Sequence, residues 1–186
     1  MILNYTEQDA IGEVTNISVG AAACYLGDMA DVDVDISIPC VSDFDVLKND
    51  NLAQGMMMGY RLSSTSFTAG YCVFVLQDSF SSFVSIVGKG KDTMASVRDT
   101  MNKIMREAMI PIEKLIEQPI HVSKETDITS QWMLNRQTED VIYTRIEIQI
   151  VIESKIHAQI VFLYPEKIAR KLAHRFISHG VALTTV

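Results

Sequence analysis

The sequence predicts an α+β domain in which two long helices pack against one antiparallel sheet. Segments 7–29 and 92–117 have the spacing and composition of long helices, and shorter apolar segments have the alternation or continuous hydrophobicity of strands. The same order of elements occurs twice along the 186 residues. We therefore expect a single domain, 1–186, built from two repeats at roughly 1–90 and 91–186 that are related by a pseudo-twofold axis.

The first repeat opens with the helix at 7–29, which is rich in Ala and Gly. The segment VDVDISIP at 32–39 alternates strictly, so it is expected to be a half-buried strand with Val32, Val34, Ile36 and Ile38 on one face. The other expected elements are a polar connection or short helix at 43–54, paired strands at 56–64 and 66–77 with a turn near Ser64–Ser66, and a short helix at 78–88 that Gly88 and Gly90 close.

The second repeat opens with the helix at 92–117, which Pro111 should kink or divide. A short strand at 119–123 and a polar stretch at 124–139 are expected next. Two long strands, at 141–153 and 154–164, need a partner surface because a lone hairpin is marginally stable in water. The last element is a helix that starts at Pro165 and extends to 178.

Matching residues support a duplication. Asn102 follows Asn16 by 86 positions, and the same interval matches Val34 with Ile120 and Ile36 with Val122. Near the end of each half the interval is 88, which matches Val73 with Val161 and Phe74 with Phe162. Unrelated halves rich in strands would also share apolar patterns, but a nearly constant interval across several elements favours duplication.

Composition narrows the function classes. The net charge is −7 and 48% of the residues are hydrophobic, so the chain has ample material for a core. There is no block rich in Lys and Arg, which argues against nucleic acid as a partner. The most basic segment, KIARKLAHR at 167–175, is either the solvated face of a terminal helix or a docking patch for an acidic partner.

The sequence also indicates where the protein is located in the cell and whether it holds a metal ion. The apolar runs are too short to span a bilayer, and the N-terminal segment lacks the pattern of a signal peptide. The three cysteines show no C-x-x-C spacing, which suits a reducing cytosol. The four histidines show no tight ligand spacing, so we expect a cytoplasmic protein without an intrinsic metal site or other cofactor.

The first predicted helix carries a stripe of polar residues. At about 100° per residue, Asp9, Glu13 and Asn16 fall on one narrow line with Gly20. The opposite side holds the residues expected to be buried, which are Ile11, Val14, Ser18, Ala21, Ala22 and Tyr25. Gly20, Ala23 and Cys24 should continue the presented face with small side chains that let another macromolecule approach. Asn is unfavourable in the interior of a helix, so its presence at position 16 needs an explanation. Either it has a function, or it is simply a polar residue that faces solvent.

The spacing of these residues resembles a known active-site pattern. Asp9, Glu13 and Asn16, followed after 22 residues by Pro39, match the D-x3-E-x2-N-x22-P pattern of the CheC/CheX/FliY family of bacterial chemotaxis phosphatases. The duplicated layout is what this family predicts, and the similarity extends over nearly the whole chain. A second copy is degraded: Asn102 is kept, but Asp99 stands in place of Glu, Ala95 in place of Asp, and Glu125 in place of Pro.

The resemblance implies a CheC-like domain that removes the aspartyl phosphate from the response regulator CheY. Asn16 would orient a water in line with the phosphorus, and Glu13 would pair with the regulator's active-site lysine. Asp9 would support Glu13 or contact the partner, Gly20 would allow close approach, and Pro39 would be structural. Magnesium would belong to CheY. The degenerate pair Asp99 and Asn102 is expected to contribute little.

A non-catalytic role is the alternative. The FliM middle domains, which share this fold, serve as structural parts of the flagellar switch and hydrolyse nothing. The chain lacks the Gly-Gly pair that the FliM family carries for rotor contact, and it retains Glu13 and Asn16, which favours the enzyme. The sequence leaves open whether a CheD-like protein or flagellar switch proteins also bind it.

Overall fold

The computed structural model describes residues 3–44, 56–64, 68–77, 82–84, 94–125 and 143–183. Along the chain the elements are α1 (Tyr5–Ala30), β1 (Val34–Ile36), β2 (Cys40–Phe44), β3 (Met56–Ser63), β4 (Thr68–Leu76), α3 (Met94–Ile116), β5 (His121–Glu125), β6 (Tyr143–Ile152), β7 (Ile156–Pro165) and α5 (Glu166–Leu183). Residues 82–84 are helical.

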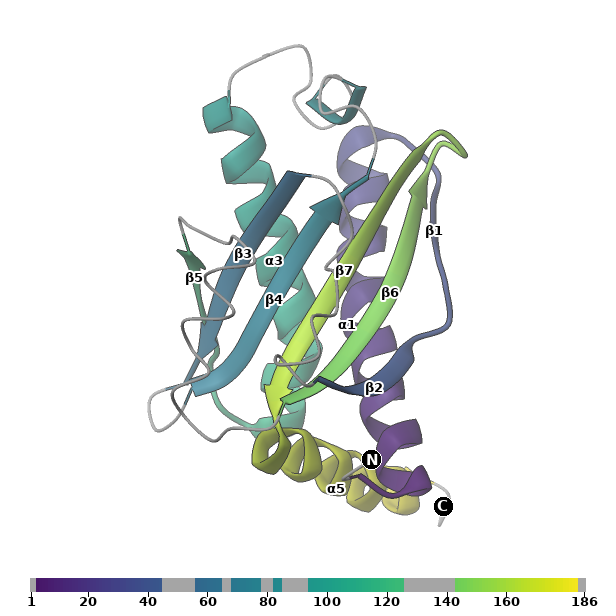
Figure 1. The fold of residues 1–186 in the computed structure, drawn as a ribbon, viewed down its shortest axis with the longest axis vertical. Coiled ribbons are helices and arrows are strands. Elements are labelled where there is room, and N and C mark those ends of the chain that lie inside the picture. Colours follow the sequence, from purple (N-terminus) through teal and green to yellow (C-terminus); the bar gives the residue numbers. More distant parts are fainter. Residues whose placement is uncertain are drawn as a thin grey trace.

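The described strands form one antiparallel sheet that helices cover on one face. The strand order is β1-β6-β7-β4-β3-β5, and β2 also pairs with β6. The long helices α1 and α3 lie side by side behind the sheet, and α5 crosses near one end of them (Figure 1). The predicted α+β class, with two long helices on an antiparallel sheet, is confirmed.

The sheet is arranged around a pseudo-twofold axis that relates the two repeats. Val73 of β4 lies opposite Val161 of β7, and these two residues are the 88-residue match found in the sequence. Each outer strand pairs with the other repeat, since β1 pairs with β6 and β5 pairs with β3. The pair Ile36 and Ile150 and the pair Leu62 and Val122 are equivalent under the 86- and 88-residue intervals. The division of the repeats near residue 90 stays a prediction, because 85–93 lie outside the described residues.

The ends of the long helices obey the same relation. Asp31 follows α1 and Glu117 follows α3, and both adopt positive φ, at 59° and 55°. Next to them, the Val32 backbone N–H donates to the Gly27 carbonyl, as that of Gln118 does to Glu113. These pairs are again 86 residues apart, so the local helix endings repeat together with the sheet pairing.

The main core lies between the sheet and the helices. Alternate residues of β6 face it, and burial of each such aliphatic side chain is worth roughly 1.5–3 kcal/mol relative to exposure. The largest fully buried side chains include Tyr60, Phe162, Ile11, Met105 and Ile146, which come from both repeats. The helices α1 and α3 are therefore fixed to one surface, and their outer faces remain available.

Several predicted elements differ in detail. The expected strand 32–39 pairs only over Val34–Ile36, and Ile38, which was expected on its buried face, is 90% exposed. The prediction of a connection or helix at 43–54 missed β2, which ends at Phe44; 45–54 lie outside the described residues. Pro111 does not divide α3, which continues to Ile116.

The remaining elements lie close to their predicted positions. Strands were predicted at 56–64, 66–77, 119–123, 141–153 and 154–164, where β3, β4, β5, β6 and β7 lie, and the final helix at 165–178 corresponds to α5. The predicted turn beyond Ser64, most of the helix at 78–88 and most of the polar stretch at 124–139 lie outside the described residues.

Candidate functional site: the polar stripe of the first helix

The start of α1 is fixed by a capping box. The Asn4 side chain accepts a hydrogen bond from the Glu7 backbone N–H at 2.9 Å, and the Glu7 carboxylate accepts one from the Asn4 N–H at 2.9 Å. These contacts satisfy two backbone donors that the helix cannot pair internally. The first turn, which precedes Asp9 directly, is thereby held in place.

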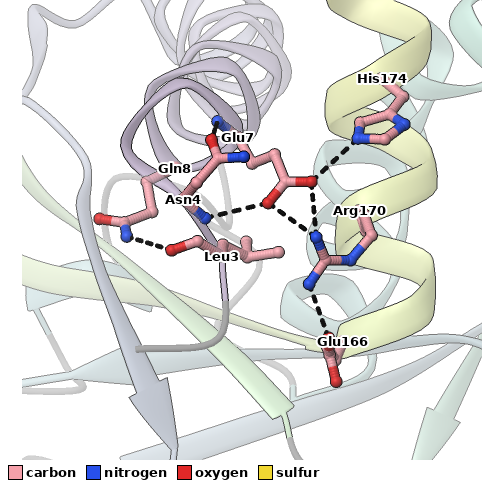
Figure 2. A network of polar contacts seen from close by, with 7 residues as sticks. All are labelled: Leu3, Asn4, Glu7, Gln8, Glu166, Arg170 and His174. Carbon is pink, nitrogen blue, oxygen red and sulfur yellow. Dashed lines mark hydrogen bonds and ion pairs between the residues drawn. The ribbon is translucent and has the colours of Figure 1, made fainter.

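Glu7 also joins α1 to α5. Figure 2 shows its buried carboxylate between Arg170 and His174, with Arg170 at 2.7 and 2.9 Å and His174 at 2.9 Å. Arg170 also contacts Glu166 at 2.8 Å. The Asn4 backbone hydrogen bond lowers the pKa of Glu7, and contacts with His174 and Arg170 lower it further against the opposing effect of burial.

This ion-pair network corrects the prediction for the basic segment 167–175. The segment is not a wholly solvated face, because Arg170 is engaged with Glu7 of α1 and with Glu166 of its own helix, and the alternative of a docking patch stays a prediction. Lys167 and Lys171 are exposed. The spacing of charges along α5 could not predict this ion pair, because Glu7, the partner of Arg170, lies more than 160 positions away in the sequence.

Asp9, Glu13 and Asn16, which we call the polar stripe, lie together on the outer side of α1. Asp9 and Glu13 are exposed and Asn16 is half-buried. Of the residues expected on the opposite side, Ile11, Val14, Ser18 and Ala22 are buried and Ala21 and Tyr25 are partly buried. Within the described part of the chain, no side-chain hydrogen bond or ion pair engages Asp9, Glu13 or Asn16, so their polar groups face outward unpaired.

The surface beside the stripe is shallow over part of its length. A Cβ added to Gly20 would meet no atom within 4 Å, and Cys24 is exposed. Ala23 was expected on this face, but it is buried at 8% exposure. Strand β1 lies beside the same end of the helix: Val34 lies 3.9 Å from the Cβ position of Gly27, one turn beyond Ala23. The presented surface therefore ends near Cys24.

Pro39 lies beside the stripe. A Cβ placed on Gly12 would be 3.9 Å from Pro39 and 3.4 Å from Val41, so the absence of a side chain at Gly12 lets the chain between β1 and β2 pack against α1. Gly12 falls between Asp9 and Asn16 on the helix surface, three and four residues from them. The structure thus brings Pro39 next to the polar stripe, although 23 positions separate it from Asn16.

Pro39 is part of a β-bulge. Ile36 pairs with Ile150 and Cys40 with Glu147, so three residues of this chain oppose two of β6. Ser37 closes the start of the bulge, because its N–H donates to the Gln149 carbonyl at 2.9 Å and its hydroxyl accepts from the Gln149 N–H at 3.0 Å. Pro has no N–H to contribute to a ladder, which suits it to such a position.

Comparison with known proteins gives a consistent result. No family model matches the chain. It is 24% identical over 188 residues to the flagellar motor switch phosphatase FliY of Bacillus subtilis (strain 168), covering 91% of this chain and 49% of that protein. The X-ray crystal structure of Thermotoga maritima FliY superposes with a TM-score of 0.72 at 21% identity, covering 96% of this chain and 99% of that one.

The chain has the FliY fold, and its resemblance to the CheC/CheX/FliY family is confirmed. The FliM middle domain from H. pylori has the same fold, with a TM-score of 0.64 at 9% identity over 93% of this chain and 99% of that one. The chain spans about half the length of the curated relative it matches. At these identities the structural matches show a shared fold, and the roles of individual residues stay predictions.

The second copy of the pattern is only partly retained in this chain. Asp99 and Asn102 are exposed on α3, at the spacing of Glu13 and Asn16. Glu125, which stands where Pro is expected, pairs regularly with Gly59, and the β5 ladder has no bulge over the described residues. Arg106 stands in place of Gly20 and binds Glu113 through two contacts, at 2.6 and 2.9 Å.

Sequence reasoning missed the residues that hold the stripe in place, which are Asn4, Glu7, Arg170 and His174. One signal was present, because Asn followed three residues later by Glu is the pattern of a capping box. In the part of the chain that the structure describes, no three His, Cys, Asp or Glu side chains are grouped to hold a metal ion. None of the described helices combines the length and hydrophobicity required to cross a membrane.

Proposed function

We propose that this chain dephosphorylates a CheY-type response regulator by positioning water at its aspartyl phosphate. The observation that carries the proposal is the pair Glu13 and Asn16, one helical turn apart on the outer face of α1 and unpaired within the described residues. The similarity to a protein named as a flagellar motor switch phosphatase supports it. An exposed helix surface suits a macromolecular substrate, and a Cβ added at Gly20 would meet no atom of the described residues within 4 Å.

The chemistry needs little from the protein. An aspartyl phosphate is an acyl phosphate, in which water attacks phosphorus, the bond from phosphorus to the aspartyl oxygen breaks, and carboxylate and dihydrogen phosphate leave. The carboxamide of Asn16 can accept a hydrogen bond from that water and stays neutral beside the phosphoryl group. Holding the water in line replaces a random encounter with a fixed geometry, which lowers the barrier without a protein nucleophile.

Glu13 would fix the docking pose. Its carboxylate is exposed and has no partner within the described residues, so it can pair with the lysine in the regulator's active site. Asp9, one turn earlier, would support Glu13 or add to the attraction. The chain would bring no cofactor, and the magnesium ion would be that of the regulator. The setting we propose is the cytoplasm, in association with the flagellar switch.

The experiment is a phosphate-release assay on the phosphorylated regulator. We expect the wild-type chain to accelerate release, and Glu13→Ala to lose most of the acceleration. Glu117→Ala is the matched control. Glu117 is a 75% exposed acid just beyond α3, in the second repeat, and it is not part of the polar stripe. Acceleration that survives Glu13→Ala unchanged would remove Glu13 from the mechanism.

A structural role in the switch is the second candidate, and the shared fold with the FliM middle domain favours it. In that case the chain would bind flagellar switch proteins, or a CheD-like protein, without hydrolysing phosphate. Binding to phosphorylated regulator with no acceleration of phosphate release would support this scaffold role. Acceleration by the purified wild-type chain would exclude a purely structural role.

A further inference from the structure

Three large apolar side chains stand out from the surface of the described residues. Tyr5 is 90% exposed, Ile38 is 90% exposed and Ile17 is 45% exposed. Each one lies next to the polar stripe. Tyr5 is one turn before Asp9 on α1, and Ile17 is one turn after Glu13, so both are helix-surface neighbours of an acid. We call Tyr5, Ile17 and Ile38 the apolar frame.

Ile38 belongs to the frame because of the bulge. In the regular alternation of β1 it would point the same way as Val34 and Ile36, which are partly buried. The extra residue between Ile36 and Cys40 interrupts that alternation, and Ile38 projects into solvent. Pro39, the next residue, packs at Gly12, which places Ile38 at the edge of the polar stripe.

The second repeat has lysines in place of all three frame residues. At the 86-residue interval, Tyr5, Ile17 and Ile38 correspond to Lys91, Lys103 and Lys124. Lys103 and Lys124 are exposed on α3 and β5, and Lys91 lies outside the described residues. The two repeats therefore keep a similar Asn and acid, but surround them with opposite surfaces.

We propose that the apolar frame is the docking surface for the phosphorylated receiver domain of the response regulator, and that it restricts docking to the first repeat. This inference rests on the proposed function. Isolated exposed apolar residues are common on proteins, but here every exposed large apolar side chain of the described residues borders one polar stripe. Protein interfaces usually have an apolar centre and a polar rim. Here the order is reversed, as expected where a polar catalytic group must reach into the partner at the centre of the contact.

Charge identifies the occupant. Asp9 and Glu13 are exposed acids within the frame and have no partner among the described residues, so we expect the occupant to present a cation surrounded by apolar surface. A receiver domain meets this requirement through the lysine beside its phosphorylated aspartate. On the second repeat, Lys103 and Lys124 are exposed cations at the positions that match Ile17 and Ile38, and they would repel that lysine.

The test uses variants that carry the second repeat's residues into the first. Ile17→Lys and Ile38→Lys change exposed positions, so circular dichroism should show an unchanged fold. We expect the double variant to raise KM for the phosphorylated regulator at least tenfold, with the maximal rate changed less than threefold. Ile17→Ala and Ile38→Ala separate loss of apolar contact from added charge, and each should raise KM about three- to tenfold. Lys103→Ala with Lys124→Ala is the control and should leave KM unchanged.

The results separate this inference from the proposed function. Rapid hydrolysis with KM unchanged in the Ile17→Lys, Ile38→Lys double variant and in the two Ile→Ala variants would overturn the docking surface and leave the phosphatase intact. Absence of hydrolysis in the wild type, with regulator binding that the Ile variants still weaken at least tenfold, would overturn the phosphatase and support the docking surface. A wild-type dimer that the Ile variants dissociate would overturn the proposal, because a second copy would then occupy the frame.

Discussion

Gly20 and Arg106 occupy equivalent positions on α1 and α3, 86 residues apart, and they create opposite surfaces beside Asn16 and Asn102. A side chain at Gly20 would enter open space. Arg106 fills the corresponding space in the second repeat, where Glu113 holds its guanidinium and the Ile120 carbonyl lies 3.4 Å away. A partner that can approach α1 closely at Gly20 would meet a charged side chain at the same place on α3.

Gly20→Arg should convert the first face into a copy of the second. We expect at least a tenfold loss of phosphatase activity, because the new side chain would stand one turn from Asn16 and keep the regulator away. Stability should be unchanged or slightly higher, since Arg is a better helix former than Gly. Gly20→Ala is the matched control and should keep full activity. Full activity in Gly20→Arg would show that the partner does not approach this part of α1.

Asn102→Ala should change the phosphatase rate by less than twofold. The residue is exposed at the right spacing from Asp99, but Arg106 follows it by one helical turn in place of Gly20, and the bulge that carries Pro39 has no counterpart in β5. A rate assay on the purified variant checks this. A loss as large as that caused by Asn16→Ala would mean that both repeats act.

Two Gly to Ala substitutions should shift stability in opposite directions. Gly70 has φ of 145°, and an added Cβ would lie 2.5 Å from the Leu163 carbonyl oxygen of β7. Gly70→Ala should therefore lower the free energy of unfolding by about 1–3 kcal/mol, because of backbone strain and the clash with the Leu163 carbonyl oxygen. Gly20→Ala should instead stabilise by about 0.5–1 kcal/mol, because the side chain has space and the unfolded chain loses freedom. Urea unfolding midpoints measure both effects.

Glu7 should make the stability of the chain depend on acid pH. Its folded-state pKa is lowered, so the ionised form stabilises the fold above the usual carboxyl range, and this contribution is lost as the pH falls through the folded pKa. Glu7→Gln removes it. The melting temperature of Glu7→Gln should lie below that of the wild type at neutral pH, and the two should converge as the pH falls toward the folded pKa. Glu117→Gln, at an exposed acid, should show no such convergence. A constant difference between Glu7→Gln and the wild type down to strongly acid pH would contradict the role of this carboxylate.

The duplicated sheet could be predicted because the pattern of apolar residues within each segment and the spacing between matching residues can both be counted along the sequence. The apolar segments identified the long strands, and the intervals of 86 and 88 residues indicated a duplication. The position of Val73 opposite Val161 is a finding of the structure. Helical spacing likewise placed Asp9, Glu13 and Asn16 on the outer face of α1.

The features that the sequence could not predict depend on contacts between distant segments. The bulge at Ile38 arises from how β1 and β2 pair with β6, so alternation alone placed this side chain on the wrong face. The burial of Ala23 depends on how other elements pack beside α1. The role of Arg170 depends on Glu7, which no local pattern connects to α5.

The most direct test of the central claim is the single-turnover rate of phosphate loss from a phosphorylated regulator mixed with excess protein. Under this condition binding is complete, so the rate reports the chemical step. Asn16→Ala should reduce this rate by roughly a hundredfold, because the water is no longer positioned, while circular dichroism and regulator binding stay the same. A rate for Asn16→Ala equal to that of the wild type would contradict the claim that this carboxamide positions water at the phosphate.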